Sequence, residues 1–164
     1  LNSLLFDAKR KGKLITFSEQ ELNKHFHVLD IKGTISGTLK IFNEDSEKYR
    51  ILEPLGMATR YQFDLEDFES DIRAGYVNIS EEDCQTFEIS TDDLQNKESS
   101  GVQRWFQYRA EQGLALLDDH RRRMPEGNFS LLTRRTLSLV YEYPARRLFK
   151  KILKEKNERI IEGK

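Results

Sequence analysis

Residues 30–42 read DIKGTISGTLKIF, and this stretch decides the predicted fold. Apolar residues or glycines occupy every second position from Ile31 to Ile41, and lysine, threonine or serine fills the positions between them. Such alternation places the two sets of side chains on opposite faces of a β-strand. The stretch therefore predicts a half-buried strand. Gly33 and Gly37 leave gaps on its apolar face, where a bulky group or a ligand could pack.

Neighbouring segments extend this strand into a predicted sheet. Residues 43–46 form a polar turn, and residues 49–52 read as the returning strand of a hairpin. Further short strands are predicted at the alternating or β-branched runs 14–17, 57–65, 76–79 and 86–89. Residues 136–143 fit either a strand or a helix, and their alternation of Leu and Tyr with polar residues favours a strand.

Helices are expected before and after this sheet. Residues 2–11 predict a short helix that ends at Gly12. Ser18 and Glu21 have the spacing of a capping box, so a second helix should run from there to about His27. Two longer helices are predicted near the end of the chain, at 102–124 and 145–161.

These elements predict an α+β fold in which an antiparallel sheet of about four to six strands spans roughly 14–90. Residues 136–143 could add one more strand, and an N-terminal helix and two C-terminal helices complete the fold. We expect a mainly β domain at 1–95, with short N-terminal helices, and a basic, mainly helical region at 101–164. The two parts should pack together as one domain, because 164 residues suffice for one substantial core.

The charges are segregated along the chain, although the net charge is only −1. Residues 41–100 carry sixteen acidic and five basic side chains, whereas residues 120–164 carry thirteen basic and five acidic ones. This pattern indicates either that the two parts face each other or that the basic part binds an anionic partner.

The basic clusters near the end of the chain are the candidate binding site. Arginine suits phosphate and carboxylate groups because its planar fork can make paired hydrogen bonds. We predict that an anionic partner, a protein or a nucleic acid, binds through Arg121, Arg122, Arg123, Arg134, Arg135, Arg146, Arg147, Lys150, Lys151 and Lys154. The alternative is a solvated basic face that pairs with the acidic segment of the same chain.

Three functions fit these features. The first is a non-enzymatic binding or adaptor module whose basic C-terminal helix engages an anionic partner or mediates self-association into a homo-oligomer. The second is a nucleic-acid-binding protein that contacts phosphates. The third is a small-molecule-binding, lipid-binding or enzymatic domain with a pocket on the β-sheet, over Gly33 and Gly37.

No catalytic residue, cofactor or metal site is predicted. The sequence has no phosphate-binding loop, dinucleotide fingerprint or nucleophile elbow. Cys84 follows three acidic residues, which raise the pKa of its thiol and make it a poor nucleophile. The acidic run at 64–71 lacks the spacing of a calcium loop, and we expect it to dock against the basic end. His25, His27 and His120 lack the short spacing of zinc ligands.

The remaining expectations concern the compartment. A single cysteine excludes an intramolecular disulfide, which fits a reducing environment. The sequence shows no signal peptide, and no apolar run approaches the roughly 20 residues that span a bilayer. A cytoplasmic location is therefore the default expectation.

Overall fold

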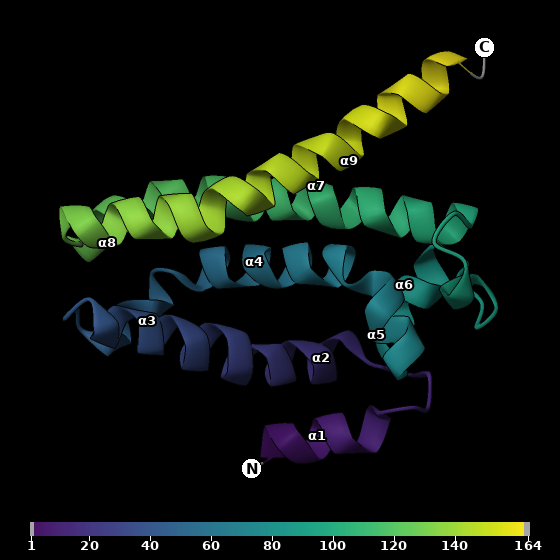
Figure 1. Ribbon diagram of the computed structural model, residues 1–164, viewed down its shortest axis with the longest axis horizontal. Helices are drawn as coiled ribbons and strands as arrows, with labels where there is room; N and C mark the ends of the chain where they lie inside the picture. The colour runs from purple at the N-terminus through teal and green to yellow at the C-terminus, as the bar shows by residue number, and fades with distance from the viewer. Residues whose placement is uncertain (1, 163–164) are drawn as a thin grey trace.

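The computed structural model describes residues 2–162, and the side chains of residues 3–155. Helices dominate this part of the chain (Figure 1). The α-helices are α1 Asn2–Arg10, α2 Glu19–Phe26, α3 Ser36–Ile41, α4 Glu53–Glu66, α5 Phe68–Ala74, α6 Glu81–Thr86, α7 Ser100–Arg123, α8 Leu131–Thr136 and α9 Tyr143–Glu162. Between them lie the π-helical segments η1 His27–Ile35 and η5 Leu137–Glu142 and the 3-10 helices η2 Ser46–Arg50, η3 Asp93–Gln95 and η4 Met124–Gly127.

The strands found in residues 2–162 are β1 Ile15–Phe17 and β2 Tyr76–Ser80, and they pair in parallel. The strands predicted near 14–17 and 76–79 are therefore confirmed. The predicted antiparallel sheet of four to six strands is wrong, and so is the α+β class. The other candidate strands are helices or turns, at 30–42, 49–52, 57–65, 86–89 and 136–143.

A spacing of four residues explains why residues 30–42 are helical. Ile31, Ile35 and Leu39 are at most 1% exposed, and their spacing places them on one side of a continuous helix made by η1 and α3. Ile41, which the alternation would bury with them, is 82% exposed. Gly33 and Gly37 therefore lie within a helix, and the pocket predicted over them on a sheet does not exist.

Two other segments also alternate in sequence like a strand but bury residues at helical spacing. In α4, Tyr61 and Leu65 are buried four residues apart, whereas Phe63 between them is 44% exposed. In η5, Leu137 is buried but Leu139 is 68% exposed. Both segments alternate in sequence yet bury only the side chains on one side of a helix.

The predicted helices agree with the structure at both ends of the chain. Helices α1, α7 and α9 occupy the expected segments. The capping box of α2 is present: Ser18 Oγ accepts a hydrogen bond from the Glu21 amide at 3.3 Å. Glu21 Oε2 in turn accepts one from the Ser18 amide at 3.1 Å.

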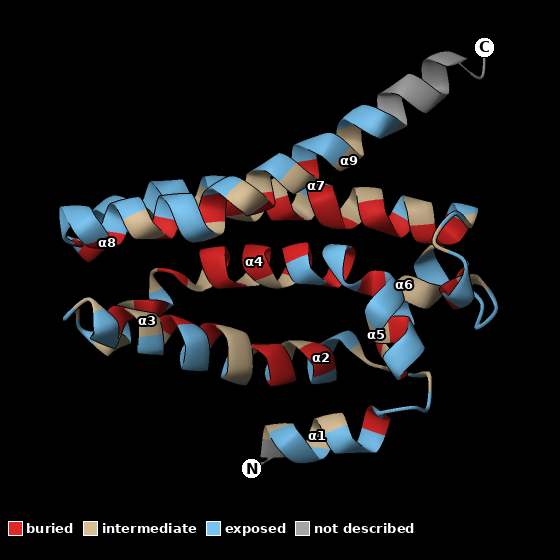
Figure 2. Ribbon diagram, in the orientation of Figure 1, coloured by how far each residue is buried: buried red, intermediate tan, exposed pale blue. Residues whose placement is uncertain are grey.

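The long helices lie in layers (Figure 1). A rod made of α2, η1 and α3 lies beside α4, and α4 packs against α7, which packs against α9. Buried residues line the facing sides of these helices (Figure 2), and Trp105 and Phe149 are fully buried between them. The mainly β character predicted for 1–95 is therefore wrong, while the division at about residue 100 stays a prediction.

Candidate functional site

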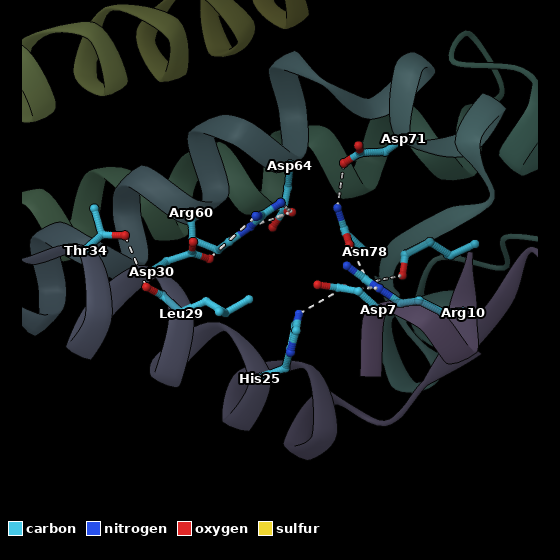
Figure 3. Close-up of polar contacts among 11 residues, drawn as sticks. Asp7, Arg10, His25, Leu29, Asp30, Thr34, Arg60, Asp64, Asp71 and Asn78 are labelled. Atoms are coloured by element: carbon cyan, nitrogen blue, oxygen red, sulfur yellow. Dashed lines mark hydrogen bonds and ion pairs between the residues drawn. The ribbon is translucent and has the colours of Figure 1, made fainter. Parts of the chain in front are cut away.

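A largely buried group of charged and polar side chains joins the N-terminal elements to α4 and α5 (Figure 3). We call this group the ionic cluster. Its members come from α1, α2, η1, α4, α5 and β2, although they are widely separated in sequence. They are Asp7, Arg10, His25, Asp30, Arg60, Asp64, Asp71 and Asn78.

Arg60 is the centre of one half of the ionic cluster. Its guanidinium donates to Asp64 Oδ1 through Nε at 2.9 Å and through a second nitrogen. It lies 3.6 Å from Asp30 Oδ2 on the other side, and 4.3 Å above the ring of Phe26. Two carboxylates and an aromatic face therefore compensate a cation that is only 15% exposed.

Arg10 is the centre of the other half. It donates to Asp7 at 3.1 Å and to the side chain of Asn78 at 2.8 Å. Asn78 donates in turn to Asp71 at 2.8 Å. His25 Nε2 lies 3.1 Å from Asp7 Oδ1, and burial lowers the pKa of this histidine, which favours the neutral ring.

Two atoms of the ionic cluster lack a hydrogen-bond partner in the described structure: Asp30 Oδ2 and His25 Nδ1. Desolvation raises the pKa values of Asp30 and Asp71 and opposes the effect of Arg60 on both. The guanidinium of Arg60 contacts both Asp30 and Asp64 (Figure 3), so the two carboxylates already share a cation. No group of three or more metal-ligating side chains occurs among the described residues. The side chains of the ionic cluster therefore contact one another and connect α1, α2, η1 and β2 to α4 and α5.

Among the described residues, no ion pair joins the acidic run at 64–71 to the basic end, although Glu66 and Lys151 line one cavity between α4 and α9. Asp64 and Asp71 face Arg60 and the Arg10–Asn78 pair, all in the first half of the chain. The basic end finds its partners locally instead. Arg121 Nε lies 2.5 Å from Glu142, whose side chain is 8% exposed.

The predicted anion-binding residues are spread over α7, α8 and α9, and two of them, Arg121 and Arg146, meet at Glu142. Arg122 and Arg123 pair with Asp119, and Arg146 pairs with Asp118 and Glu142. Arg134 donates to the Phe129 carbonyl, and Lys151 pairs with Glu155. Arg135, Arg147, Lys150 and Lys154 lie exposed on α8 and α9. Binding of an anionic partner by these residues stays a prediction.

Helix α9 diverges from α7 toward its C-terminal end (Figure 1). Residues of both helices, together with residues from α4 and from the segment before α7, line a cavity. We call it the α7–α9 cavity, and its volume is about 340 Å³. Four apolar side chains contribute to its lining: Leu65, Phe106, Leu148 and Ile152. Lys97 and Lys151 contribute as well, together with glutamate and glutamine side chains. The Lys97 ammonium lies 5.4 Å from the centre of the Phe106 ring, so its charge and the apolar surface are close together.

Sequence reasoning missed this cavity, because its lining comes from segments far apart in the chain. Part of the signal was present in the apolar face of the last predicted helix, which includes Leu148 and Ile152. The view of Cys84 as a poor nucleophile is supported. Burial, together with Asp83 and Glu81, raises the pKa of its thiol to about 11.

The arrangement defines a mainly helical fold with layered antiparallel helices and one minimal sheet. It resembles the structure of squalene synthase HpnC from Alicyclobacillus acidocaldarius, with a TM-score of 0.71 and 18% sequence identity. The likeness covers 88% of this chain and 54% of that one, so the chain spans about half the length of the protein it matches. No family model and no curated protein matches the sequence.

This likeness corrects the functional predictions. The adaptor module and the nucleic-acid-binding module, both predicted with an α+β fold, are wrong, because the fold is helical and resembles that of the squalene synthase structure. The third hypothesis places a pocket on the β-sheet over Gly33 and Gly37, and that pocket is wrong because both residues lie in a helix. In the described part of the chain, no helix combines the length and hydrophobicity needed to cross a membrane.

Proposed function

We propose that the chain is a helical ligand-binding domain whose α7–α9 cavity takes an apolar, chain-like molecule of the isoprenoid kind. The observation that carries the proposal is the composition of the cavity. Its apolar side chains suit a hydrocarbon chain, and its charged and amide groups suit a polar end. A volume of about 340 Å³ falls within the range of small-molecule sites in proteins.

The fold supports the chemical class of this ligand. The solved structure that it resembles is that of a squalene synthase, and squalene is an apolar hydrocarbon. The positions of the apolar side chains are consistent with such a ligand. Phe106 comes from α7, whereas Leu148 and Ile152 come from α9, so a bound chain would contact both helices.

Farnesol, an isoprenoid alcohol, is a suitable probe, and the protein contains its own reporter. Trp105 is the single tryptophan, and its ring centroid lies 5.6 Å from that of Phe106. Farnesol in contact with Phe106 should therefore change the tryptophan fluorescence in a saturable way. Gln107 lines the cavity, and the variant Gln107→Phe places a bulky ring there. It should weaken binding at least about tenfold, since the ring takes up space that the apolar chain would occupy.

The matched control is Gln112→Phe, which makes the same change on α7 at a residue that does not line the α7–α9 cavity. This variant should bind farnesol as the parent protein does. A fluorescence change that does not saturate would contradict the proposal. Equal binding by the two variants would contradict it as well.

A further inference from the structure

The outer face of the rod formed by α8, η5 and α9 exposes large apolar side chains. We call them the apolar strip: Leu131, Leu132, Leu139, Val140 and Tyr143. Each is between 57% and 68% exposed. Five such residues within thirteen positions of one rod exceed the scattered exposure that is ordinary on protein surfaces.

The burial pattern of the rod shows that these residues share one side. Its inward positions, all buried, are Thr133, Leu137, Glu142, Ala145 and Phe149. Their spacing is four, five, three and four residues, which is that of one helical face with a wider step in η5. The apolar strip occupies positions between these buried residues, so it points away from the core. The outward side of α8 and α9 is exposed in Figure 2.

Basic side chains continue this outer face. Arg135 lies between the two halves of the apolar strip, and Arg147 and Lys150 follow Tyr143 at helical spacing. All three are exposed, and the described residues offer their side chains no ion pair or hydrogen bond. Glu142 is the single acidic residue between 131 and 154, and it is buried against Arg121 and Arg146. Between residues 131 and 154, the outer face therefore combines apolar surface with cations that have no acidic residue beside them.

We propose that this face docks on the surface of an anionic lipid bilayer. The apolar strip would enter the boundary between head groups and acyl chains, and the basic residues would contact anionic head groups. A polyanion such as a nucleic acid would bind the basic side chains through its phosphates, but it would leave the leucine side chains exposed to water. The uncompensated positive charge distinguishes this face from an interface between apolar surfaces alone. The proposal is independent of the ligand assigned to the α7–α9 cavity.

Vesicle co-sedimentation of the full chain tests the proposal. One set of vesicles contains phosphatidylcholine alone, and the other contains phosphatidylcholine and phosphatidylserine in equal parts. We expect binding to the mixed vesicles that weakens as salt is added, because salt screens the head groups. The double variant Leu139→Ser/Val140→Ser should reduce binding at least about tenfold, since it removes apolar contact. Reversing Arg147 and Lys150 to glutamate should reduce it at least about tenfold as well.

Two controls make the same chemical changes elsewhere. Ile41→Ser alters a side chain that is 82% exposed on α3, and Lys32→Glu/Lys40→Glu reverses two exposed lysines on η1 and α3. Both controls should bind as the parent protein does. All the changed residues are exposed, so the variants should fold normally, which circular dichroism can verify.

Three results would overturn the proposal. The first is the absence of any preference for the mixed vesicles. The second is undiminished binding by Leu139→Ser/Val140→Ser. The third is a lack of vesicle binding together with a dimer, observed by analytical ultracentrifugation, that this variant abolishes. Such a dimer would show that the apolar strip contacts a second copy of the chain.

Discussion

Replacing Gly113 with alanine tests how closely α7 approaches α9. Gly113 lies in the middle of α7, where alanine normally stabilises a helix by about 1 kcal/mol relative to glycine. Here, a Cβ atom at residue 113 would lie 2.3 Å from Cε2 and 2.4 Å from Cζ of Phe149. Phe149 is fully buried, so its ring cannot move into solvent to make room.

The magnitude follows from these opposing effects. Overpacking a core typically costs 1–3 kcal/mol, and an approach as close as this one is expected to reach or exceed the upper end of that range. After the helix-propensity gain is subtracted, Gly113→Ala should lower the free energy of unfolding by about 2 kcal/mol. For a chain of this size, that corresponds to a drop of about 4–8 °C in Tm.

The matched control is Gly37→Ala on α3, where an added Cβ meets nothing within 4 Å. It should raise the free energy of unfolding by about 0.5–1 kcal/mol in urea denaturation. Adding Phe149→Leu to Gly113→Ala should cost less than the sum of the two single changes, because the smaller side chain makes room for the new methyl group. If Gly113→Ala is as stabilising as Gly37→Ala, the close approach of the two helices is refuted.

Three further predictions concern charged and nucleophilic groups. Arg60→Met should lower the free energy of unfolding by about 3–5 kcal/mol in urea denaturation, because it leaves the carboxylates of Asp30 and Asp64 without a compensating cation. A loss below about 1 kcal/mol would show that solvent compensates the charges of the two carboxylates. Glu44 accepts hydrogen bonds from Lys48, the Ser130 amide and Thr133, and they lower its pKa from 4.5 to about 2. The ionised Glu44 side chain therefore contributes stability that is complete above about pH 4.5 and is lost as the pH falls through about 2. Glu44→Gln should lower the free energy of unfolding by about 1–2 kcal/mol at pH 7 and by progressively less in acid. Thermal melts across that pH range measure this difference. The Cys84 thiol, with its pKa raised to about 11, should react with iodoacetamide at pH 8 at least about tenfold more slowly in the folded protein than in urea, and equal rates would contradict its burial.

The features that could be predicted from the sequence are local ones. Ser18 and Glu21 lie three residues apart, so their reciprocal hydrogen bonds need no information from the rest of the fold. The helices α7 and α9 were predictable for a similar reason. Their apolar residues recur at helical spacing without a competing alternation.

The wrong secondary-structure predictions concern segments whose apolar residues fit both the helical and the strand period. Ile31, Ile35 and Leu39 are four apart and also share a parity, so the pattern fits a helix as well as a strand. Tertiary packing decides between them, and the exposure of Ile41 and of both glycines, which share that parity, shows that the helical period holds. The three serine and threonine residues between them, which favour strand or turn in isolation, strengthened the wrong interpretation.

The candidate sites depend on contacts that no local pattern contains. Asp30 and Arg60 are thirty residues apart, and their pairing requires η1 to lie against α4. Within α4, the four-residue spacing of Arg60 and Asp64 would have predicted their ion pair, had the segment been interpreted as a helix. The apolar strip is hidden in the same way, because the alternation in 136–143 favours a strand that would bury Leu139.

The wider step between Leu137 and Glu142 holds one residue more than a regular α-helical face requires. Deleting one residue there would shorten the step from five residues to four, so the inward positions would follow one another at steps of four, four, three and four. Thr133, Leu137, Ala145 and Phe149 would then still face the core, on a regular α-helix. Inserting a further residue would instead turn Ala145 and Phe149 by about 100° relative to Thr133 and Leu137, away from α7. We therefore expect natural variants of the segment to tolerate a deletion better than an insertion.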